Sequence, residues 1–166
     1  KNKQIDLSLL LSVSHSNNNH KKWAINHLNE DFKSLSEVAV LILGIVYKRG
    51  TNTVRRSHSI ELSNDLSKTC EEIYLYDPLV KSEDILNLGP NVYLLKSITE
   101  LNKKFDCIIL TREWDGILDE LKELFNIHQT SSINIYDLHR KFYKNIAFFK
   151  SNKCFYKTVG LPSKNS

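Results

Sequence analysis

From residue 37 onward the chain alternates short, almost wholly apolar runs with longer segments of mixed polarity. Five of these runs are EVAVLIL, EIYLYD, NVYLLK, DCIILT and SINIYD, and CFYKTVG is a candidate sixth. Their apolar residues follow one another without strict alternation, which is typical of strands that are covered on both faces. The segments between the runs are each long enough for one helix. The pattern predicts an α/β domain built on a doubly wound parallel sheet of five or six strands.

Helical periodicity marks two of the connecting segments. Between residues 57 and 69 the expected inward positions are Ile60, Leu62 and Leu66, and the expected N-cap is one of the serines at positions 57 and 59. A second, strongly amphipathic helix is predicted from Trp114 to Phe125. With these helices the sheet is expected to form a Rossmann-like fold.

The first 35 residues carry a different pattern. Trp23, Leu28 and Phe32 recur at helical spacing, and the polar stretch SHSNNN interrupts the segment before them. We therefore expect one or two helices here, packed on the domain or on a second subunit. The predicted organisation is a helical segment over residues 1–35, an α/β domain over residues 36–161 and a flexible tail over residues 162–166.

The stretch that follows the first strand is the most informative for function. The strand breaks at Gly44, the chain then presents Tyr47 and Lys48, and Arg55 stands just before the predicted helix. A strand, a loop with cations and a helix N-terminus together favour a bound phosphate, because backbone N–H groups and the helix dipole attract an anion. The stretch matches neither the GxGxxG pattern of dinucleotide sites nor the Walker A pattern. Side-chain cations and the helix N-terminus are therefore expected to hold the phosphate.

Residues after the later strands are further candidates, because ligands of doubly wound sheets bind at the carboxyl ends of the strands. Asp77 is either a ribose ligand or a turn former. His139 and Arg140 follow the fifth strand, and they are either ligand contacts or a cation pair at a helix start. The pair Glu113-Trp114 is expected mainly to serve packing and capping.

Composition narrows the class of function. The 166 residues carry a net charge of +4 with basic and acidic residues interleaved, so nucleic-acid binding is not expected. The apolar runs are too short for a membrane helix and no secretion signal is recognisable, so a cytoplasmic location is expected. Three widely spaced cysteines argue against structural zinc and a disulfide framework, and Cys107 inside FDCIIL is expected to be a buried, inert thiol. No catalytic centre and no metal site is recognisable.

Several stretches of the chain match, in the same order and at similar spacings, the motifs of one enzyme family. GIVYKRGTNTVRRSHSIEL matches a glycine–x–x–phenylalanine–lysine opening with a later arginine–x–serine. IYLYDPLV, IILTREWDGI and KTVGLPS match tyrosine–aspartate–proline, glutamate–tryptophan–aspartate and terminal glycine segments, and NNNHKKWAINHL matches the end of a long central helix that forms a dimer. Nearly the whole chain thereby resembles the C-terminal, UDP-binding domain of the UDP-glucose and GDP-mannose dehydrogenase family.

The resemblance implies a function and a set of contacts. Members of the family oxidise the C6 alcohol of a nucleotide sugar to a carboxylate in two NAD-dependent steps, with NAD held mainly on an N-terminal domain. By position, Tyr47 and Lys48 would contact the nucleotide sugar, and Arg55 would reach NAD across the interdomain cleft. The family's second nucleotide-contacting arginine falls on His139, with Arg140 one place later. The glutamate–tryptophan segment favours UDP-glucose as the sugar substrate, and the complete enzyme is expected to be a homodimer that serves polysaccharide biosynthesis.

The chain also departs from the family pattern. The changed positions, which add positive charge near the cleft or replace a glycine, are Asn52, Thr53, Arg56, His58 and Leu138. Neither the GxGxxG motif of the family's N-terminal domain nor its catalytic cysteine motif has a counterpart, and the chain contains no Met. We therefore expect a piece of a longer enzyme that is inactive alone. The open alternatives are an altered sugar specificity, a paralogue with decayed activity and a non-catalytic α/β nucleotide- or partner-binding module.

Overall fold

The computed structural model describes residues 19, 22–46, 54, 57–85, 88–128 and 132–161. Six parallel strands form one sheet in this part of the chain, in the spatial order β3-β2-β1-β4-β5-β6. Their bounds are Ala39–Leu43 (β1), Glu72–Tyr76 (β2), Val92–Leu94 (β3), Cys107–Leu110 (β4), Asn134–Asp137 (β5) and Phe155–Thr158 (β6). The chain winds outward from β1 in one direction and from β4 in the other, which confirms the predicted doubly wound α/β sheet and its sixth strand.

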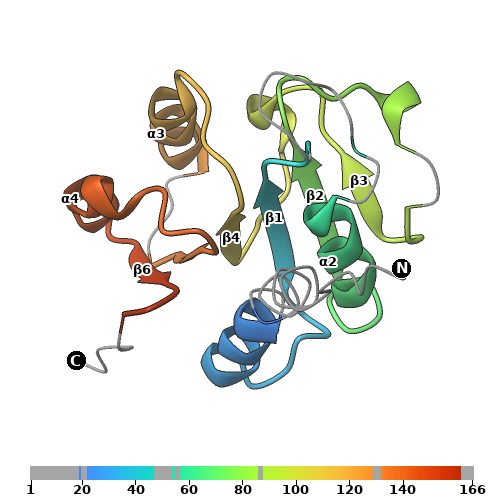
Figure 1. Ribbon diagram of the computed structural model, residues 1–166, viewed down its shortest axis with the longest axis horizontal. Coiled ribbons are helices and arrows are strands. Elements are labelled where there is room, and N and C mark those ends of the chain that lie inside the picture. Colours follow the sequence, from blue (N-terminus) through green and yellow to red (C-terminus); the bar gives the residue numbers. More distant parts are fainter. Residues whose placement is uncertain are drawn as a thin grey trace, which may run out of the picture.

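Helices lie against this sheet in two groups. Among the described residues, the helices are residues 22–31, α2 (His58–Leu66), α3 (Ile117–His128) and α4 (Ile146–Ser151). The short 3₁₀ turns there are η1 (Ser82–Asp84), η2 (Ile98–Glu100) and η3 (Tyr143–Asn145). In Figure 1 the blue helix of residues 22–31 and α2 lie beside β1, whereas α3 and α4 lie together near β6. None of the helices in the described ranges is long and apolar enough to cross a membrane.

The central strand β1 buries both of its faces, as its continuous apolar run predicts. All five of its residues are buried, with Val40 and Ile42 in one apolar core and Leu41 and Leu43 in the other. The first core is covered by the helix of residues 22–31, called the N-terminal helix below, and by α2. The second core is covered by α3, α4 and η2. A sheet covered on both faces leaves the ends of its strands as the natural place for a ligand.

The N-terminal helix packs on this domain. Ala24 and Leu28 are fully buried in the first core, and the Trp23 ring lies edge-on to the Tyr136 ring of β5 with the centroids 6.4 Å apart. The Tyr136 hydroxyl also donates a hydrogen bond to Asp31 at 2.7 Å. Of the two arrangements expected from the sequence, the structure therefore shows packing on the domain, while the proposed boundary after the helix stays a prediction.

Two connections and one helix differ from the sequence-based expectation. The β2–β3 and β3–β4 connections contain the 3₁₀ turns η1 and η2 in place of full helices. Pro78 and Pro90 stand in the first of these connections, and proline removes a backbone donor that a helix interior needs. The helix expected to start at Trp114 begins instead at Ile117, because Gly116 adopts φ +91° and belongs to a turn.

Candidate functional site

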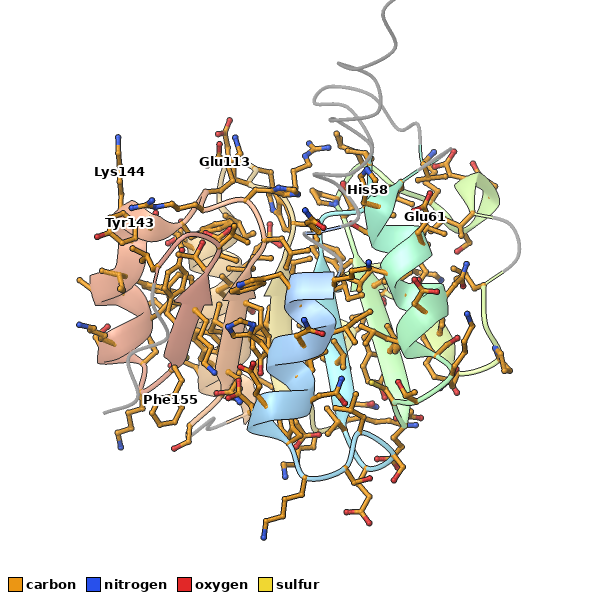
Figure 2. All side chains as sticks on the ribbon, turned by 60° about the horizontal axis from the view of Figure 1, so that its bottom comes forward. His58, Glu61, Glu113, Tyr143, Lys144 and Phe155 are labelled. Carbon is orange, nitrogen blue, oxygen red and sulfur yellow. The ribbon has the colours of Figure 1, made fainter. Side chains whose placement is uncertain are left out.

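The strand order reverses between β1 and β4, whose following helices lie on opposite faces of the sheet. At such a switch point the carboxyl ends of the strands are the usual ligand site. Figure 2 shows this edge at the top, with His58 at the start of α2, Glu113 after β4, and Tyr143 and Lys144 after β5. Phe155, the first residue of β6, lies at the opposite edge. We call the ends of β1, β2, β4 and β5, with the residues that directly follow them, the carboxyl edge.

Asp77, directly after β2, organises the turn that follows β1. Its buried Oδ2 atom accepts hydrogen bonds from the N–H of Ile45 at 2.8 Å and of Val46 at 3.1 Å. Its Oδ1 atom accepts from the N–H of Leu79 at 3.0 Å. Of the two roles expected for this residue, the structure shows the turn former, and the carboxylate is buried.

A second group of hydrogen bonds joins β1, α2 and β4. The Ser59 hydroxyl donates to the Gly44 carbonyl oxygen at 2.6 Å and lies 3.1 Å from the Thr111 hydroxyl. Ser57 occupies the N-cap position of α2, but its hydroxyl donates to the Ile45 carbonyl oxygen. The expected N-cap position is confirmed at Ser57, but its side chain forms no capping bond, because the hydroxyls of both serines bond to the turn after β1. The N-terminus of α2 is thus fixed at the carboxyl edge without a side-chain cap.

Arg112 follows β4 and lies across the end of β1. A Cβ atom added at Gly44 would be 2.5 Å from the Arg112 Cβ, and the Arg112 Nη1 atom lies 3.9 Å from the Asp77 Oδ2. The Arg112 side chain is 16% exposed, and its Nε and Nη1 atoms are buried without a hydrogen-bond partner. No role was predicted for this residue from the sequence. The available signal is its position two residues after a strand that neighbours β1.

Asp137, the last residue of β5, is the centre of a closed network. Its Oδ2 atom accepts hydrogen bonds from the Tyr156 hydroxyl at 2.6 Å and the Phe142 N–H at 2.7 Å, and its Oδ1 atom accepts from the His139 N–H at 3.2 Å. Burial and the bond to this carboxylate raise the pKa of Tyr156 well above its ordinary value. Asp137 is fully buried, so it shapes the loop after β5 and does not face solvent.

The two sequence-predicted contacts after β5 lie at the carboxyl edge. His139 and Arg140 are both exposed. Arg140 adopts φ +56°, and its guanidinium lies 4.6 Å from the centroid of the Tyr143 ring. Leu138, which replaces the glycine of the family pattern, is buried in the first core, so packing accommodates this departure. The nucleotide contacts of His139 and Arg140 stay predictions.

A hollow of about 560 Å³ lies beside the loop between β4 and α3. Its lining residues are Glu113, Trp114, Asp115, Gly116, Ile117, Leu118, Asp119, Phe142 and Asn145. The Trp114 indole N–H donates to the Glu120 carboxylate at 3.0 Å, and the ring packs edge-on to Tyr76 with the centroids 5.8 Å apart. These contacts confirm the packing role expected of Trp114. Burial and the nearby Glu120 carboxylate raise the pKa of Tyr76 to about 12.

The thiols are buried away from this edge. Cys70, Cys107 and Cys154 are all unpaired. Burial raises the pKa of each thiol, and Cys107 is fully buried, which confirms its interpretation as an inert thiol. Within the ranges that the structure describes, no three His, Cys, Asp or Glu side chains gather to hold a metal ion.

Some of the residues singled out from the sequence lie outside the described residues. They are Tyr47, Lys48, Asn52, Thr53, Arg55 and Arg56. His58, another departure from the family pattern, is described. Its Nδ1 atom lies 3.8 Å from the Glu61 Oε2, one turn further along α2.

Comparisons with known proteins agree with the fold. The model of the UDP-glucose/GDP-mannose dehydrogenase family, UDP binding domain, matches residues 41–143. The UDP-glucose 6-dehydrogenases of Rickettsia bellii and Rickettsia prowazekii are each 29% identical, over 69% and 80% of this chain. The chain covers only 27% and 31% of their lengths.

A solved structure shows the same fold. The UDP-N-acetyl-mannosamine dehydrogenase Cap5O from S. aureus matches with a TM-score of 0.55 and 16% identity, over 84% of this chain and 30% of that protein. The residues of the family match run from within β1 to η3, so they include the switch point and most of the carboxyl edge. The chain belongs to the UDP-glucose/GDP-mannose dehydrogenase family and contains its UDP binding domain.

Proposed function

We propose that this chain binds UDP-glucose through its nucleotide, as the C-terminal domain of an NAD-dependent nucleotide-sugar 6-dehydrogenase. The match of the family's UDP binding domain over a switch-point sheet carries the proposal. The names of the Rickettsia relatives support UDP-glucose as the sugar nucleotide. In the complete enzyme the C6 alcohol would be oxidised to the carboxylate of UDP-glucuronate, for use in polysaccharide biosynthesis.

The proposed substrate contacts are Tyr47, Lys48, His139 and Arg140. His139 and Arg140 are exposed at the carboxyl edge, so a ligand reaches them without a change in the core. Tyr47 and Lys48 directly follow Val46 in the sequence, and the Val46 N–H donates to Asp77 just after β2. Cations suit the phosphates of the nucleotide, and an aromatic ring suits its base or sugar.

NAD is proposed to bind mainly to a part of the longer enzyme outside this chain, with Arg55 as the contact from this side. The described part of the turn after β1 does not fit a dinucleotide. A dinucleotide turn uses glycine so that the diphosphate approaches the backbone. A Cβ at Gly44 would instead be 2.5 Å from the Arg112 Cβ and 2.7 Å from the Thr111 hydroxyl, so this glycine faces β4. No step of cofactor chemistry is therefore assigned to the described residues.

The chain alone is proposed to be inactive. A cysteine nucleophile reacts as an accessible thiolate, whereas all three thiols here are buried with raised pKa values. Catalysis, a homodimeric assembly and a cytoplasmic location are proposed for the complete enzyme, with neither nucleic acid nor membrane as a partner.

Isothermal titration calorimetry of the chain with UDP, UDP-glucose and GDP tests the proposal. We expect UDP and UDP-glucose to bind more tightly than GDP, and weakly in absolute terms, because this chain supplies only part of the cleft. A clear preference for GDP, or no UDP binding even in the longer enzyme, would contradict the proposal. Binding of none of these nucleotides would favour the non-catalytic partner-binding module.

A substitution in the longer enzyme tests the substrate contact of Lys48. Lys48→Ala is expected to raise the KM for UDP-glucose strongly, because a phosphate loses a cation. Lys144→Ala is the matched control, since Lys144 is an exposed cation at the carboxyl edge (Figure 2). An unchanged KM in Lys48→Ala would remove Lys48 from the site.

A further inference from the structure

Arg112 carries hydrogen-bond donors that no described residue uses. Its Nε and Nη1 atoms are buried, and neither has an acceptor. Buried guanidinium nitrogens in folded proteins normally donate to a carboxylate, a phosphate or a carbonyl oxygen. The side chain is 16% exposed, so it is not sealed from solvent. The carboxyl edge therefore contains a guanidinium with two nitrogens that lack an acceptor.

Asp77 does not supply that acceptor. The distance of 3.9 Å between the Arg112 Nη1 and the Asp77 Oδ2 is too long for a hydrogen bond. The same Oδ2 atom already accepts from the N–H of Ile45 and Val46, and Oδ1 accepts from the N–H of Leu79. The Asp77 carboxylate thus offsets part of the charge of Arg112 at 3.9 Å, while the Nε and Nη1 donors of the guanidinium make no hydrogen bond.

The position of Arg112 fits an anion held at the switch point. Its Cβ lies against Gly44 and its Nη1 lies near the end of β2, so the side chain spans the end of β1. The neighbouring Thr111 is tied to the first turn of α2 by the Ser59 hydroxyl at 3.1 Å. The uncapped, positive end of α2 therefore lies at the same edge as the guanidinium. Glu113 points outward from this edge in Figure 2, where water screens its charge.

We propose that Arg112 binds the diphosphate of the uridine nucleotide, by donating hydrogen bonds to phosphate oxygens. A diphosphate offers several charged acceptors close together, which match a guanidinium fork, whereas uracil and ribose offer neutral groups. The identity of the nucleotide rests on the proposed function. Arg112 is then a binding residue additional to Lys48, and it replaces the glycine-rich backbone that other nucleotide folds present to phosphate.

Calorimetric titration of the chain with UDP, uridine, inorganic pyrophosphate and NAD tests this role. Arg112→Met keeps the length of the side chain and removes its donors, and Arg112→Lys keeps the charge and removes the fork. We expect Arg112→Met to weaken binding of UDP and pyrophosphate about tenfold or more, and Arg112→Lys to weaken it less. Uridine binding is expected to stay unchanged. Lys144→Met, which removes an exposed cation at the same edge, is expected to match the wild type.

Thermal unfolding separates a binding role from a structural one. We expect Arg112→Met without ligand to melt close to the wild-type temperature, because Nε and Nη1 make no hydrogen bond and only the long ion pair with Asp77 is lost. UDP is expected to raise the melting temperature of the wild type but not of this variant. If Arg112→Met does not fold and Arg112→Lys binds UDP as tightly as the wild type, Arg112 is structural and the proposal is overturned.

The remaining outcomes separate this proposal from the proposed function. UDP binding that is equal in the wild type and both variants overturns the role of Arg112 and leaves the proposed function in place. Pyrophosphate binding that depends on Arg112, with no UDP binding to the wild type, contradicts the proposed function but supports Arg112 as a diphosphate ligand. The proposal is also overturned if the affinity for NAD, but not for UDP, depends on Arg112. It is overturned as well if the affinity for none of the four ligands depends on Arg112.

Discussion

The Oδ2 atom of Asp77 accepts a hydrogen bond from the N–H of Ile45 at 2.8 Å, which couples the end of β2 to the turn after β1. The two strands are parallel with Leu43 paired to Tyr76, so the residue after Tyr76 lies beside the turn that follows Leu43. The segment that carries the proposed nucleotide contacts therefore starts from a turn fixed by a buried carboxylate. Other nucleotide folds use a glycine-rich backbone at this place.

Replacing Asp77 should destabilise the domain. Asp77→Ala leaves the N–H groups of Ile45, Val46 and Leu79 without an acceptor, so we expect the free energy of unfolding to fall by about 3 kcal/mol or more. Asp77→Asn keeps one acceptor oxygen and should lose about half as much. Urea denaturation measures both values, with Asp115→Ala as an exposed control on the same edge. Equal stability of Asp77→Ala and the wild type would show that the turn does not depend on this carboxylate.

Gly44 and Gly116 form a matched pair for a second prediction. Both adopt positive φ angles, +97° and +91°, but a Cβ at Gly44 would be 2.5 Å from the Arg112 Cβ, whereas a Cβ at Gly116 would meet nothing within 4 Å. Gly116→Ala should therefore cost only the backbone term of about 1 kcal/mol. Gly44→Ala adds a clash with two packed side chains and should cost at least twice as much in urea denaturation. Equal losses of stability in the two variants would show that the residues after β4 move aside without a loss of free energy.

The sequence was sufficient to predict the sheet because its signal is local. The run Ala39–Leu43 is apolar at every position, and such a run is sufficient to predict a strand that is covered on both faces. The carboxyl edge follows from the same pattern, since the residue after each run must lie there. The exposure of His139 and Arg140 at that edge agrees with this reasoning.

The contacts within the edge could not be predicted, because they join segments far apart in the chain. Ser57 is a good N-cap residue by type, yet its hydroxyl donates to the Ile45 carbonyl oxygen, which only the folded turn brings within reach. Asp77 accepts from the amides of Ile45 and Val46 because β2 lies next to β1. Two Arg112 donors lack an acceptor, although the Asp77 carboxylate lies nearby and accepts from backbone N–H groups. The spacing of residues along the sequence does not predict which of these hydrogen bonds form.

The docking of the N-terminal helix can be tested at Tyr136. Its hydroxyl is buried and donates to Asp31 at 2.7 Å, and Lys157 also bonds to the same Asp31 oxygen at 2.8 Å. Tyr136→Phe removes one of these donors, so we expect a loss of about 1–2 kcal/mol in the free energy of unfolding and faster amide exchange in residues 22–31. Tyr143→Phe, at an exposed ring, is the control. Unchanged exchange in the helix would show that this bond does not hold it to the sheet.

The buried thiol of Cys154 gives the stability a dependence on alkaline pH. Burial raises its pKa from an ordinary value of 9.0 to about 11, so the folded state keeps a proton that the unfolded state loses. The contribution of this thiol to the free energy of unfolding is complete below pH 9 and disappears as the pH rises from 9 to about 11. We expect the wild type to lose up to about 2 kcal/mol more than Cys154→Ala over this interval in urea denaturation. Because the other titrating groups are shared by the two proteins, parallel pH profiles would show that the thiol does not cause the loss.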